Sequence, residues 1–135
     1  MLATFMQGRK NSPFYCQNLK KGNTLSLHHF TMTLNDGVTM DQFLDFFKTK
    51  YKSAMEKNFS GMKVYLLNGI KGECLNCNGI IVVWKTKADM EKHYNPDGSA
   101  TEITKTINAK MKPITDELGT LAKVTNRKYT TWEIQ

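Results

Sequence analysis

The chain has 135 residues, of which 40% are apolar and 23% are charged, and its formal net charge is +7. This length predicts one domain, and the share of apolar residues excludes a disordered chain. The longest apolar run, Ile80 to Trp84, is far shorter than the ~20 residues of a spanning helix, so no membrane association is expected.

Residues 1–23 are predicted to be a basic N-terminal extension before one domain at 24–135. The extension contains four basic residues and no acidic one, so most of the excess charge lies in this tail. A nucleic-acid binder usually gathers basic and aromatic residues on one face, so nucleic acid is not an expected partner. The tail lacks the order of a secretory signal, and three cysteines, an odd number, favour unpaired thiols in a reducing compartment. We therefore expect a cytoplasmic protein.

Hydrophobic periodicity predicts six main elements and one short helix in chain order. "TLSLHHFTMTL" at 24–34 alternates as a strand with apolar residues on both faces. A long amphipathic helix is expected at 39–59, where Thr39 and Gln42 match a capping box. The later elements are strands at 62–69 and 80–85, a short helix at 87–94 capped by Thr86, a helix at 100–122 and a strand at 124–134. Pro113 predicts a kink or a new helix start within 100–122.

The order strand, helix, strand, strand, helix, strand predicts a ferredoxin-like α+β fold. Two right-handed strand–helix–strand units give a four-stranded antiparallel sheet with both helices on one face. The strands at 24–34 and 80–85 are nevertheless apolar on both faces. Because bare apolar sheet surface is disfavoured in water, we expect a second copy of the chain to cover the open face. The predicted assembly is therefore a homodimer joined sheet to sheet.

Cys74 and Cys77 lie three apart in the loop between two predicted strands. This spacing is found in zinc knuckles, but a closed structural zinc site needs four ligands. Only Cys16 and a histidine (His28, His29 or His93) could complete such a site, and nothing in the sequence places them near the pair. A redox pair usually begins a helix, which this pair does not. We therefore predict no metal site, with metal binding or redox chemistry by Cys74 and Cys77 as minor alternatives.

The paired histidines His28 and His29 are the candidate catalytic residues. Neighbouring residues of a strand point to opposite faces. His28 shares its parity with Phe30 and Met32, which favours helix packing, whereas His29 is expected on a more polar wall as a base or ligand. Ordinary structural histidines are the alternative. Candidate ligand-binding residues, which could equally be packing, turn or helix-end residues, are Tyr65, Trp84, Tyr129, Trp132, Asn35 and His93.

Three stretches then indicate a family. These are "LHHFTMTL", the long helix after "NDGVT", and "GIIVVWKTKADMEKHYNPDG". Over residues 24–134 they resemble the dimeric α+β barrel superfamily, which includes stress-responsive barrel, NIPSNAP-like, EthD-like and antibiotic-biosynthesis monooxygenase-like proteins. The resemblance implies a dimeric α+β barrel that binds a small aromatic molecule or acts as a cofactor-independent monooxygenase.

In that interpretation no cofactor is needed, His29 is the polar group of the cavity, and Tyr65, Trp84 and Trp132 are its walls. The competing interpretation is a non-enzymatic dimeric interaction or regulatory module. A third is a protein stabilised by a metal on Cys74 and Cys77.

Overall fold

Four strands form one antiparallel sheet in the computed structural model, which describes residues 18–135. The strands are β1 (Thr24–Leu34), β2 (Met62–Asn68), β3 (Asn78–Trp84) and β4 (Ala122–Glu133). Their order across the sheet is β2-β3-β1-β4, and every neighbouring pair is antiparallel. This order confirms the predicted ferredoxin-like α+β fold.

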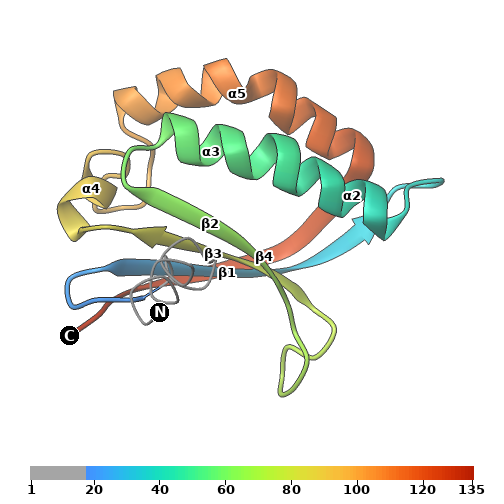
Figure 1. Cartoon of the computed structure of the whole chain (residues 1–135), viewed down its shortest axis with the longest axis horizontal. Coiled ribbons are helices and arrows are strands. Elements are labelled where there is room, and N and C mark those ends of the chain that lie inside the picture. The colour runs from blue at the N-terminus through green and yellow to red at the C-terminus, as the bar shows by residue number, and fades with distance from the viewer. Residues whose placement is uncertain (1–17) are drawn as a thin grey trace, which may run out of the picture.

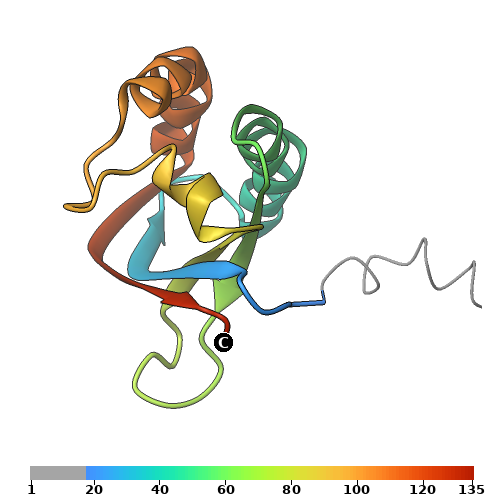
Figure 2. The same cartoon turned by 90° about the vertical axis from the view of Figure 1, so that its left-hand side faces the viewer.

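The helices all lie on one face of the sheet (Figures 1 and 2). They are α2 (Met40–Phe46), the π-helical segment η2 (Phe47–Tyr51), α3 (Lys52–Asn58), α4 (Lys87–Glu91) and α5 (Glu102–Leu121). The predicted capping box is present, because Gln42 N–H donates to Thr39 Oγ1 and Thr39 N–H donates to Gln42 Oε1. Pro113 lies inside α5, and the helix continues through it without a new start.

The core lies between the helices and the sheet as two adjoining clusters. The first joins Phe43 and Phe47 of the long helical segment to Val64 and Ala122 of the sheet. The second is built on the following buried residues: Phe59, Met62, Trp84 and Met111. In β3, Ile80, Val82 and Trp84 alternate toward these clusters, as the pleat requires.

The opposite face of the sheet carries an apolar patch beside polar residues such as His29 and Lys128, and it is not covered by a helix of residues 18–135 (Figure 2). Cross-strand partners place Leu25 beside Val83 and Trp132, and Leu27 beside Ile81. Leu25, Leu27, Ile81 and Val83 are half-buried, and Trp132 is 50% exposed. We call these five residues the open face.

A β-bulge in β4 changes which residues face the helices. Between His29 and Thr31 of β1, the partner strand advances from Lys128 to Thr125, so β4 holds one extra residue. Asn126 adopts a positive φ of 55° at this point. The extra residue shifts the alternation of side chains between the two faces of β4 by one position. As a result, side chains from both ends of β4 face the helical layer.

The chain before β1 is tied to the end of the sheet from Gly22 onward. Gly22 N–H donates to the carbonyl of Ile134 at 2.8 Å, and Ile134 N–H donates to the carbonyl of Asn23 at 2.9 Å. Residues 1–17 of the predicted extension lie outside the described residues. Within residues 18–135, no helix is long and apolar enough to cross a membrane.

Candidate functional site

A cavity of about 230 Å³ lies between the helices and the sheet. It adjoins a wider groove of about 1120 Å³, because the two share His28, Tyr94 and Arg127 among their lining residues. Tyr51 of η2, and Asn108 and Thr115 of α5, complete its polar lining, and the remaining lining residues are apolar. A largely apolar pocket with a few converging polar groups is typical of small-molecule sites.

His28 of β1 points into this cavity. Its ring stacks on that of Tyr129, its cross-strand partner, with centroids 5.2 Å apart and planes at 19°. Its Nδ1 atom is buried and has no hydrogen-bond partner among residues 18–135. Burial, and then the charge of Arg127, lowers the pKa of His28 below its ordinary value of 6.5. The imidazole is therefore neutral at neutral pH and has a free polar atom for a ligand.

Arg127 supplies a positive charge to the same cavity. It follows the bulge residue Asn126, and its guanidinium carbon lies 5.6 Å from the ring centre of Phe30. Two half-buried phenols share the site: partial burial raises the pKa of Tyr51 and of Tyr94, and the charge of Arg127 partly opposes both shifts. Both phenols therefore stay protonated and can donate a hydrogen bond.

The structure separates the residues that the sequence placed together. His29 is exposed on the face opposite His28, as the strand parity predicts. Trp84 is buried in the core on the helix side, whereas Trp132 belongs to the open face, so the two do not form one wall with His29. The reason is the parity of β3, where Trp84 aligns with Val82 and Ile80 rather than with Ile81.

The other three candidates have structural partners. His93 is buried, its Nδ1 lies 3.1 Å from Thr104 Oγ1, and its ring stacks on Trp84 at 5.3 Å. The side-chain amide of Asn35 donates to the carbonyl of Gly119 at 3.0 Å. Tyr65 lies on the edge strand β2, with the Lys52 ammonium 4.4 Å from its ring centre. Of the aromatic candidates, Tyr129 is the one whose ring stacks on His28 beside the cavity.

Sequence reasoning missed Arg127 and gave Tyr51 only a packing role. Tyr51 belongs to the apolar stripe of the helix, where the pattern predicts that an aromatic residue packs in the core and does not indicate a role for its hydroxyl group. Arg127 is directed by the bulge at Asn126, and an Asn inside a Thr-rich strand is the one signal that could have indicated it.

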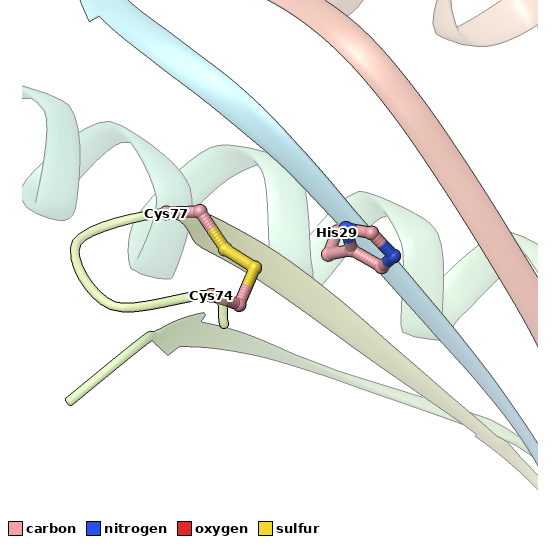
Figure 3. Close-up of side chains that lie close together, drawn as sticks. All are labelled: His29, Cys74 and Cys77. Carbon is pink, nitrogen blue, oxygen red and sulfur yellow. A yellow bond between two sulfur atoms is a disulfide. The ribbon is translucent and has the colours of Figure 1, made fainter. Parts of the chain in front are cut away.

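Cys74 and Cys77 are joined by a disulfide in the hairpin between β2 and β3 (Figure 3). The expectation of unpaired thiols is therefore wrong for this pair. The structure also places His29 beside the pair: one ring nitrogen of His29 and the two sulfurs lie within 4.8 Å of one another. The sequence did not indicate this proximity, because it depends on the pairing of β1 with β3.

A search of protein-family models finds no match, and a search of curated proteins finds none. A dimeric protein of unknown function and ferredoxin-like fold from Bacteroides fragilis is similar, with 16% identity and a TM-score of 0.42. The match covers 86% of this chain and 100% of that one. The ferredoxin-like assignment rests on the strand order itself.

Proposed function

We propose that the cavity between the helices and the sheet binds a small aromatic molecule with an acidic hydroxyl or enol group. The observation that carries this proposal is the buried, unpartnered Nδ1 of His28 in a cavity that also contains Arg127. A buried polar atom without a partner costs free energy, so a ligand that supplies the partner gains that amount. Arg127 favours a ligand that becomes anionic, and the apolar walls favour an aromatic body.

The same groups suit a cofactor-independent oxygenation. Neutral His28 accepts the proton of the bound enol, and Arg127 stabilises the resulting anion. In such a reaction the electron-rich anion reduces O₂ directly. A CH₂ group bonded to the aromatic rings becomes C=O: it loses both hydrogens, one oxygen atom of O₂ enters the product, and the other leaves with those hydrogens as water. The tricyclic ketone anthrone, which ionises through its enol, is a suitable probe.

Binding of anthrone tests the pocket, and oxygen uptake tests the chemistry. Arg127→Gln should weaken binding by about 10- to 100-fold, because a hydrogen bond to a charged group contributes about 1.5–3 kcal/mol. His28→Gln should abolish the oxygen uptake of the wild-type protein. The matched control is Lys128→Gln. Lys128 is the cross-strand partner of His29 and lies with it on the opposite face, so this variant removes a neighbouring positive charge outside the cavity. Equal affinity of the Arg127 and Lys128 variants, or no binding to any of them, would reject the pocket.

The apolar open face supports a second proposal, that two copies of the chain form a homodimer sheet to sheet. Its five residues lie on three neighbouring strands, and a two-fold axis would bury each of them against the partner's sheet. If the protein dimerises but the cavity binds no ligand, the function is that of a dimeric interaction module. Mass measurement in solution together with ligand titration separates these two functions.

A further inference from the structure

The hairpin between β2 and β3 is held in shape by its backbone as well as by its disulfide. Gly69 N–H donates to the carbonyl of Cys77 at 2.8 Å, and Asn76 N–H donates to the carbonyl of Gly69 at 2.9 Å. Cys77 N–H donates to the carbonyl of Cys74 at 3.1 Å. A Cβ atom added to Gly69 would lie 1.8 Å from the carbonyl oxygen of Cys74, so the close approach requires glycine. Because these contacts do not involve the sulfur atoms, we expect them to keep the two cysteines together after the disulfide is reduced.

Strand register then brings His29 to the cysteines. His29 pairs with Gly79 of β3, which has no side chain to separate the imidazole from the hairpin. Cys77 lies two residues before Gly79 and therefore on the same side of the strand as His29. Figure 3 shows the imidazole of His29 on β1 beside the sulfur pair. In the single chain His29 is exposed and both cysteines are half-buried, so the group is reachable from solvent.

We propose that Cys74, Cys77 and His29 form a zinc site that exists when the disulfide is reduced. Thiolate and imidazole are the ligands that Zn²⁺ prefers, and a Cys₂His set with an open fourth position is a known zinc arrangement. Ligand atoms around tetrahedral zinc lie about 3.5–3.8 Å apart, given bonds of about 2.0–2.3 Å. The ligand atoms lie within 4.8 Å of one another, so small rotations of the side chains close the site once the sulfurs separate.

The disulfide and the zinc site are alternative states of the same two sulfurs. Two molecules of a low-molecular-weight thiol donate two electrons and two protons, which breaks the Cys74–Cys77 bond and yields two protein thiols and one small disulfide. Zinc then binds as both thiols lose their protons to water. An oxidant of the disulfide class reverses the sequence and releases the metal.

A metal site accounts for the geometry better than a catalytic dithiol does. A reactive dithiol usually has its thiol at the start of a helix, where the dipole lowers the thiol pKa. Here β3 follows the pair, and no helix begins there. The third ligand, an imidazole from strand β1, is of use to a metal site, whereas a catalytic dithiol does not need it. The site lies on the face opposite the cavity, so its test is independent of the proposed ligand binding.

The experiment uses tag-free full-length protein with Cys16→Ser, which leaves only the two hairpin thiols. After reduction with a phosphine, Zn²⁺ is titrated against a chromogenic chelator. We expect one zinc per chain, and none after oxidation to the disulfide. Cys74→Ser or Cys77→Ser should abolish binding. His29→Gln should weaken it by more than about 100-fold, beyond the 10- to 100-fold cost of losing an outer-shell partner. His28→Gln, which changes the neighbouring histidine on the opposite face, should leave zinc affinity unchanged.

Cobalt gives a second readout that does not depend on affinity. Co²⁺ in the reduced protein should show a thiolate-to-metal charge-transfer band, and its visible spectrum should change in His29→Gln because one nitrogen ligand is lost. Thermal melting of each variant confirms that it folds. Equal zinc binding by the oxidised and reduced proteins, an unchanged affinity and spectrum in His29→Gln, or loss of binding caused by Cys16→Ser would overturn the proposal.

Discussion

Replacing Trp132 with serine should weaken the proposed homodimer by at least about 100-fold. A buried tryptophan removes 150–250 Å² from water, and Trp132 is still 50% exposed in the single chain, so roughly 120 Å² remains for the partner to cover. At about 25 cal/mol per Å², this area contributes about 3 kcal/mol in each copy. A two-fold interface contains the residue twice, so the upper limit of the lost dimerisation free energy is about 6 kcal/mol. A loss of half that free energy already corresponds to an increase of about 100-fold in Kd.

Sedimentation equilibrium over a range of protein concentrations measures the dissociation constant directly. Tyr129→Ser is the control, because Tyr129 lies on the same strand and is 57% exposed, yet faces the helix side beside His28. The reasoning predicts a large loss for Trp132→Ser and little change for Tyr129→Ser. A wild-type mass of 15.4 kDa at micromolar concentration, or equal effects of the two substitutions, would refute the sheet-to-sheet interface.

Three further predictions concern stability and the hairpin. Thr104→Val removes the partner of buried His93 and should lower the free energy of unfolding by about 1–3 kcal/mol in urea denaturation; an unchanged midpoint would contradict the hydrogen bond. Burial, and then the charge of Lys92, lowers the pKa of His93 below 6.5, so its stabilisation is present above that pH and is lost as pH falls through its folded pKa. Between about pH 6.5 and 5.5 the loss is at most about 1.4 kcal/mol, and His93→Gln should show a smaller pH dependence than wild type. Gly69→Ala should disfavour the Cys74–Cys77 disulfide without unfolding the sheet, and an unaltered thiol–disulfide equilibrium in a glutathione buffer would contradict this.

Local patterns in the sequence were sufficient to predict most of the fold. The strand at 24–34 has the predicted limits, because its alternation ends at the turn sequence that follows Leu34. The capping box at Thr39 also located the start of the first helix, because its two hydrogen bonds join residues only three apart in the chain. The π-helical segment Phe47–Tyr51 was not predicted, since its apolar spacing resembles that of an ordinary helix. Pro113 removes only one backbone donor, and α5 continues across it from Glu102 to Leu121.

The candidate site depends on contacts between distant strands, which no local pattern reports. The opposite facing of His28 and His29 followed from strand alternation alone. The residues around His29 can be identified only from its register with Gly79. Those around Arg127 can be identified only from the one-residue bulge in β4. A shift of one residue in either pairing would move the side chain to the other face. Strand alternation therefore placed His28 and His29 on opposite faces, as the structure has them, but it could not indicate the groups that surround each ring.

The central position of β1 also has a consequence for how the chain folds. β1 begins at residue 24, yet one of its two neighbours is β4, whose residue Trp132 pairs with Leu25. A contact between segments so far apart in the chain must overcome a large loop-closure entropy, which slows folding. During synthesis, β1 lacks this neighbour until β4 has been made, so the backbone groups of β1 on that side stay without their strand partners for that time. We therefore expect slow refolding, with the pairing of β1 and β4 as a late step, and a requirement for protection of β1 in the nascent chain.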